Sequence, residues 1–136
     1  MKRIVNLTPH AIVVLPEGGN NGRVEFKPSR YRLFVKVEDT PAGELNAVEG
    51  TAPVVEQKLK EMVLLKDELP MDEDEVKEFF KFVDGVIVSS IVASRVKELK
   101  EFAGKEDLEV YVPNTAKAIR DEQGRIVGVP NLVRVG

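Results

Sequence analysis

The stretch at residues 84–104, DGVIVSSIVASRVKELKEFAG, is the most apolar continuous segment of the chain and decides where its core lies. It opens with an apolar run at residues 86–88, which is typical of a buried β-strand. Beyond Ser89 and Ser90, apolar residues recur at helical spacing with charged residues on the opposite face, which predicts an amphipathic helix over 91–103. Either serine can cap the start of this helix, and Gly104 can end it in a left-handed conformation. We therefore expect a strand that leads into a helix and forms part of the scaffold.

Around this unit the chain shows a mixture of strand and helix patterns. Short alternating runs predict strands, and an acidic start followed by spaced apolar residues predicts a helix over 72–83. Residues 40–53, rich in Pro, Gly, Ala and Thr, read as a loop, with a short strand near residues 47–48 as an alternative. Residues 54–65, VVEQKLKEMVLL, leave two alternatives, because their apolar spacing fits a helix whereas both ends resemble strands. This order predicts an α+β fold with a mostly antiparallel mixed sheet or partial barrel and about two helices packed on it. The predicted strands are residues 3–6, 11–15, 23–26, 32–38, 86–88, 108–112, 125–129 and 132–135, with turns at 17–22 and 121–125.

Composition excludes several classes of function. The chain has 136 residues, 43% hydrophobic and 32% charged, which indicates one domain spanning residues 1–136. A net charge of −3 provides no basic field for nucleic acid, so we expect no nucleic-acid partner. Cysteine is absent and His10 is the only histidine, which excludes thiolate and multi-histidine metal sites within one chain. We expect neither a metal nor another cofactor.

The sequence also lacks the usual signals for membranes and export. No apolar run approaches the roughly 20 residues that span a bilayer, and the apolar run near the N-terminus is too short for a signal peptide. We therefore predict a cytoplasmic protein that does not associate with membranes. Abundant lysine and glutamate without cysteine or tryptophan is typical of thermophile proteins.

Four segments of the chain are similar to segments of known sequences. Together they resemble a family of small uncharacterised bacterial, archaeal and phage proteins, which open with Asn-Leu-Thr-Pro-His and close with an Arg-Asp-x-x-Gly-x-Ile hairpin. The matching segments cover roughly a quarter to a third of the chain, and the resemblance brings no activity, cofactor or catalytic residue with it. It implies that residues 8–10 and 120–124 deserve testing as one site, that residues 54–70 are extended, and that 71–82 are an insertion. The segments are VNLTPHAI at 5–12, VSSIVA at 88–93, VP at 112–113 and IRDEQGRIVGV at 119–129.

His10 is the candidate general base, because its side chain alone has an unperturbed pKa near neutrality. Asp121 is the candidate carboxylate that would orient it, and Arg120 the candidate clamp for an anion. The candidate ligand-binding residues are Thr8, Asn114, Arg120 and Arg125. The alternative is that the same residues serve only their turns, since Pro, Asp and Gly are favoured there for conformational reasons.

Two hypotheses of function follow. The first is a non-enzymatic binding or assembly module that self-associates, as a homodimer, through short apolar strands near the termini. The second is a small hydrolase, or an enzyme acting on a phosphorylated ligand, that uses His10 with Asp121 and Arg120. A small-molecule or anionic ligand is the partner that the second hypothesis requires. Whether the protein is an enzyme is left open by the sequence.

Overall fold

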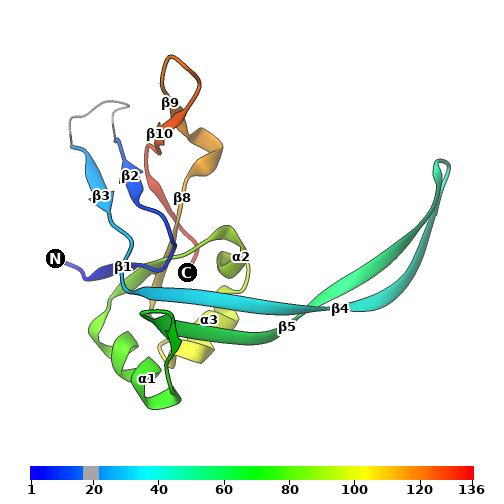
Figure 1. Ribbon diagram of the computed structural model, residues 1–136, viewed down its shortest axis with the longest axis horizontal. Coiled ribbons are helices and arrows are strands. Elements are labelled where there is room, and N and C mark those ends of the chain that lie inside the picture. The colour runs from blue at the N-terminus through cyan, green and yellow to red at the C-terminus, as the bar shows by residue number, and fades with distance from the viewer. Residues whose placement is uncertain (17–21) are drawn as a thin grey trace.

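The computed structural model describes residues 1–16 and 22–136, and their fold belongs to the α+β class (Figure 1). The predicted class is confirmed: antiparallel pairings outnumber parallel ones, three α-helices accompany the sheets, and the described strands close no barrel. The turn predicted at residues 17–22 falls, apart from Gly22, outside the described residues.

The central sheet has four strands in the order β1 (Ile4–Asn6), β7 (Gly85–Ile87), β8 (Glu109–Pro113) and β11 (Leu132–Arg134). β7 pairs in parallel with both β1 and β8, whereas β11 runs antiparallel to β8. The predicted apolar run is confirmed as the centre of the protein, since Val86 and Ile87 are fully buried. Gly85 is required at its place, because a Cβ there would lie 2.8 Å from the carbonyl oxygen of Glu109.

Helices α1 (Glu73–Phe82) and α3 (Val96–Ala103) lie at the bottom of the body in Figure 1, and the short α2 (Ser90–Ala93) lies higher, beside the central sheet. Asp72 caps α1 in a reciprocal capping box with Glu75, and Gly104 ends α3 in the left-handed conformation. The single helix predicted over 91–103 is wrong, because the chain breaks at Ser94 and Arg95. The Ser94 hydroxyl donates to the Ile91 carbonyl at 2.7 Å, a local bond that competes with helix continuation.

The hydrophobic core lies between the helices, the sheet and the root of a long hairpin. Phe80 and Leu99 are buried with Leu64, which comes from that hairpin. The Phe80 ring meets Phe79 edge-on at 4.9 Å between centroids, and Phe79 in turn lies 4.4 Å from the ring of Tyr31, at the first residue of the hairpin. Aromatic contacts therefore fix the hairpin's root to α1.

Two smaller hairpins join the two ends of the chain above the central sheet. One consists of β2 (Ile12–Val14) and β3 (Val24–Phe26), and the other of β9 (Ile119–Arg120) and β10 (Ile126–Gly128), preceded by the 3₁₀ turn η1 (Thr115–Lys117). Val14 forms a parallel bridge with Val129, and Leu15 donates from its amide to the Val129 carbonyl at 2.8 Å. Segments more than 100 residues apart thus lie side by side.

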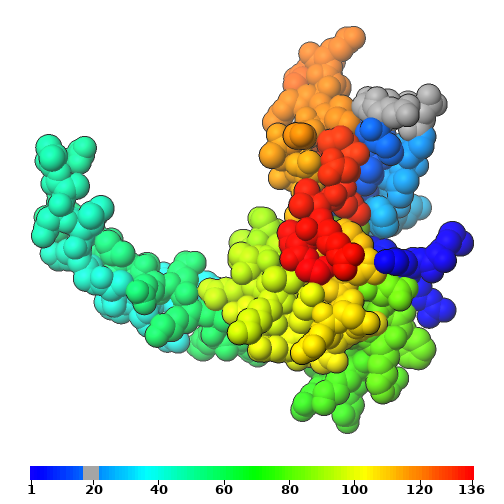
Figure 2. Space-filling view, turned by 180° about the vertical axis from the view of Figure 1, so that it is seen from behind, coloured from blue at the N-terminus to red at the C-terminus, as the bar shows by residue number. Residues whose placement is uncertain are grey.

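The largest departure from the sequence-based expectation is the β arm, formed by β4 (Tyr31–Ala47) and β5 (Gly50–Lys66), with 17 residues in each strand. The loop predicted at 40–53 is wrong, and the helix alternative for 54–65 is also wrong, because both segments pair antiparallel along the arm. β6 (Leu69–Pro70) pairs with the root of β5. The outer arm, residues 38–57, stands away from the body in both Figures 1 and 2.

Candidate functional site

The Asn-Leu-Thr-Pro-His segment forms a turn organised by Asn6, which is only 2% exposed. Its Nδ2 donates to the carbonyls of His10 and Phe26 at 2.8 and 2.9 Å, and its Oδ1 accepts from the Thr8 amide and hydroxyl at 2.9 and 2.6 Å. The Asn6 side chain thereby satisfies its hydrogen-bonding groups while closing the turn. Thr8, a candidate ligand-binding residue, contributes its hydroxyl to this turn.

Asn6 is a residue that the sequence-based search for a site overlooked. Its position gave a signal, since an asparagine at a strand end followed by Thr-Pro favours a turn closed by the asparagine side chain. Ser29 continues the network by donating to the Asn6 carbonyl at 2.8 Å, just before β4 begins. The turn is therefore tied both to β3 and to the root of the β arm.

His10 is exposed and lines a shallow groove of about 440 Å³. The opposite wall comes from the C-terminal part of the chain, where Thr115, Ile126 and Val127 contribute mostly apolar surface. The structure therefore brings the N-terminal turn and the returning strand β10 to one groove. The approach is close, since a Cβ on Gly128 would lie 2.9 Å from the Val13 carbonyl oxygen.

Asp121 and the two candidate arginines make their hydrogen bonds within the β9–β10 turn. Asp121 Oδ1 accepts from the amides of Gln123 and Arg125, each at 2.9 Å, and Oδ2 accepts from Arg125 Nε at 3.1 Å. These bonds, led by the Arg125 amide, hold the pKa of the Asp121 carboxyl below its usual range. Arg120 donates to the Gly124 carbonyl at 2.7 Å.

The groove around His10 and the β9–β10 turn are thus neighbours with separate polar contacts. None of Asp121, Arg120 and Arg125 lines the groove, and no hydrogen bond or ion pair joins them to His10 among residues 1–16 and 22–136. Asn114 donates to the Asn131 side chain at 3.3 Å, beside the same wall. The described part of the chain also holds no group of three or more His, Cys, Asp or Glu suited to a metal ion.

A buried carboxylate joins the two ends of the chain across β8. Glu109 is 7% exposed and accepts hydrogen bonds from Lys2 Nζ at 2.7 and 2.8 Å and from the Tyr111 hydroxyl at 2.5 Å. Arg134 lies 3.7 Å away on β11. The Lys2 hydrogen bond is the main cause that lowers the pKa of Glu109, and the hydrogen bond to Glu109 raises the pKa of Tyr111. These contacts link the N-terminal residue Lys2 and the C-terminal strand β11 to β8, and so stabilise the position of both chain ends on the central sheet.

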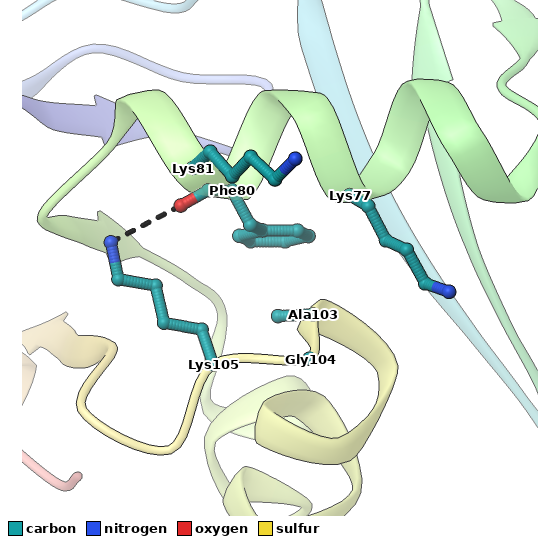
Figure 3. A pocket seen from close by; sticks show the side chains of 6 residues that line it. All are labelled: Lys77, Phe80, Lys81, Ala103, Gly104 and Lys105. Atoms are coloured by element: carbon teal, nitrogen blue, oxygen red, sulfur yellow. Dashed lines mark hydrogen bonds between the residues drawn. The ribbon is translucent and has the colours of Figure 1, made fainter.

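A pocket of about 360 Å³, the lysine groove, opens between α1 and α3 (Figure 3). Its lining residues are Lys77, Phe80, Lys81, Ala103, Gly104 and Lys105. Lys105 Nζ donates to the carbonyls of Phe80 and Val83 at 3.2 and 2.7 Å, so it satisfies the C-terminal end of α1. Lys77 and Lys81 extend from α1 and each meets a glutamate of the same helix, at 3.3 and 3.2 Å. Such exposed pairs are worth little, which leaves both ammonium groups available to another anion.

The β arm has one mostly apolar face and one mixed face, on which charged residues lie beside the half-exposed Phe34 and its cross-strand partner Val63. Strand alternation places cross-strand pairs on the apolar face in an order that starts in the core: Leu33 with Leu64, Val35 with Met62, Val37 with Leu59, Asp39 with Gln57, and Pro41 with Val55. The polar pair within this series is self-satisfied, since Gln57 donates to Asp39 at 3.1 Å. The opposite face carries a Lys36–Glu61 ion pair at 3.5 Å and sets Glu38 against Lys58.

No helix in the described part of the chain is long and apolar enough to cross a membrane. Comparison of the chain with family models, with curated proteins and with solved structures found no match in any of the three. The function therefore has to be inferred from the geometry of the chain itself.

Proposed function

We propose that the protein is a non-enzymatic assembly module that self-associates through the apolar face of its β arm. The observation that carries this proposal is a stripe of apolar residues that is buried at the root of the arm and uncovered farther out. Leu33 and Leu64 are 9% and 1% exposed, whereas Val37 and Val55 are 40% and 51% exposed on the same face. Apolar surface arranged in this way marks an interaction site.

The surface area of the chain supports the proposal. A compact monomer of 15.1 kDa is expected to expose about 7,100 Å². The chain exposes 9266 Å², an excess of about 2,200 Å². A standard interface buries about 800 Å² on each partner, so the excess is large enough for a stable assembly.

The energetics of the outer arm point the same way. Ordering each residue costs about 1–2 kcal/mol in backbone entropy, and an isolated two-stranded hairpin is at best marginally stable in water. Among the described residues, one side-chain hydrogen bond ties the outer arm to the helical part of its own chain, from Arg95 NH2 to the Gln57 carbonyl at 3.3 Å. Contact with a second copy would bury the apolar face and stabilise the extended arm.

This proposal moves the self-association surface away from the terminal strands on which the sequence-based hypothesis relied.

A cytoplasmic location and a thermophilic source remain predictions from composition. The alternative of an enzyme that uses His10, Asp121 and Arg120 is less well supported, because the last two side chains make their hydrogen bonds inside their own turn.

Sedimentation velocity over a range of protein concentrations tests the proposal. We expect the wild-type chain to form an oligomer, and the double variant Val37→Ser/Val55→Ser to shift strongly towards monomer. Phe34→Ser/Val54→Ser is the control, since it also replaces exposed apolar residues by serine on the same two strands but on the opposite face, and it leaves the charge of the arm unchanged. A monomeric wild type, or equal effects of the two double variants, would overturn the proposal.

A further inference from the structure

We infer that the tip of the β arm of one copy occupies the lysine groove of another copy. This inference rests on the proposed function, and it names the surface that receives the arm. It follows from the chemistry of the two parts, which lie at a distance from each other within one chain (Figure 1).

The outer arm is acidic as well as apolar. Residues 38–57 include five carboxylates and neither lysine nor arginine: Glu38, Asp39, Glu44, Glu49 and Glu56. At the apex, between the paired residues Ala47 and Gly50, Val48 is 103% exposed and is followed directly by Glu49. A fully exposed valine at the tip of a projecting hairpin has no structural use within its own chain, so the tip presents an apolar knob beside a negative charge.

The lysine groove has the complementary character. Its floor is apolar, because the Phe80 ring faces Ala103 between α1 and α3 (Figure 3). Lys77 and Lys81 stand along one rim, and no carboxylate is among the lining residues. Glu73 and Glu78 compete for these two ammonium groups, but only as exposed pairs within one helix. The volume of about 360 Å³ accommodates a valine side chain together with a carboxylate.

Geometry places the receiving groove on a different copy. Each strand of the outer arm adds about ten residues beyond the body, which at about 3.3 Å per residue carries the tip roughly 30 Å outward. Figure 2 shows the arm clear of the body along this length. The tip therefore meets a second copy, with Val48 on the apolar floor and Glu44 and Glu49 facing Lys77 and Lys81. Complementary charge of this kind sets the register of an interface and excludes wrong partners.

Charge reversal on each side, followed by mixing, tests the contact in the full-length chain. We expect Glu44→Lys/Glu49→Lys and Lys77→Glu/Lys81→Glu each to weaken self-association at least tenfold in sedimentation velocity. A mixture of the two variants should recover it, because every arm then finds a groove of opposite charge. Lys27→Glu/Lys117→Glu is the control for net charge, since it changes two exposed lysines elsewhere and should self-associate like the wild type.

The outcomes separate this inference from the proposed function. A monomeric wild type overturns both. A wild-type oligomer that persists in Lys77→Glu/Lys81→Glu overturns the groove as receiver and leaves the arm proposal standing. Two weakened variants that do not recover on mixing also overturn the arm-to-groove contact, with circular dichroism of each variant confirming its fold. Should the reversed groove variant fail to fold, Lys77→Gln/Lys81→Gln replaces it, and undiminished association then counts against the inference.

Discussion

Replacement of Asn6 by alanine is expected to destabilise the folded chain by about 2–4 kcal/mol. The substitution removes the amide that donates to the carbonyls of His10 and Phe26 and accepts from Thr8. Asn6 is 2% exposed, so water cannot take over its place without a change in the surrounding structure. The turn that holds the N-terminal segment against β3 then loses the side chain that closes it.

The magnitude follows from counting the lost bonds and discounting for solvent. An intramolecular hydrogen bond contributes about 0.5–1.5 kcal/mol net, which over the four bonds gives about 2–6 kcal/mol. Thr8 is partly exposed and His10 is exposed, so water can satisfy some of their groups, and the lower part of that range applies. A domain is stable by only about 5–15 kcal/mol, so the loss is large.

Urea unfolding followed by circular dichroism, at one fixed protein concentration, measures this loss. With a slope of about 2 kcal/mol per molar urea, in the middle of the usual range, the midpoint should fall by roughly 1–2 M. Asn114→Ala is the matched control, because it removes the same amide from a more open site with one bond of 3.3 Å to Asn131, and it should cost less than about 1 kcal/mol. If Asn6→Ala costs no more than this control, the Asn6 network does not stabilise the turn.

Two further predictions concern the central sheet. Because its partners lower the pKa of Glu109 in the folded state, the ionised carboxylate contributes stability above the ordinary value of 4.5, and that stability is lost as the pH falls through the lower folded-state pKa. Glu109→Gln should therefore flatten the decline of the urea midpoint below pH 4.5, whereas an unchanged slope would contradict the role of the cluster. Gly85→Ala should destabilise the chain by about 1–3 kcal/mol in the same assay, because its Cβ would lie 2.8 Å from the Glu109 carbonyl oxygen, and a neutral effect would refute that close contact.

The elements that could be predicted from the sequence are those whose signals lie in their own residues or in the residues next to them. The apolar run at 86–88 could only be a buried strand in so polar a chain, and Asp72 and Gly104 carry the capping chemistry that starts α1 and ends α3. The turn residues around Asp121 and Gly124 likewise follow from local hydrogen bonding and backbone freedom. In each case the signal lies within a few residues of the feature.

The β arm could not be predicted in this way. Its outer strands have no core to impose alternation, and Pro41 with Gly43 at a bulge gives the composition of a loop. Residues 54–65 contain good helix formers. Their extended state depends on pairing with β4, whose residues are distant in the sequence, as in the pair of Lys36 with Glu61. Nor could local sequence show that His10 reaches the wall of β10, because that contact depends on the bridge between Val14 and Val129.

The distribution of charge explains why the arm should meet the body of another copy rather than another arm. The chain has a net charge of −3, and the outer arm contributes −5, so the remaining residues carry +2. Two outer arms packed side by side would bring ten carboxylates together without a single basic side chain from either outer arm, which opposes contact even between apolar faces. An arm that lies on the body of a neighbour instead combines burial of Val48 with attraction to Lys77 and Lys81. The apolar face supplies the driving force for association, and the charge pattern selects which surface the arm can use.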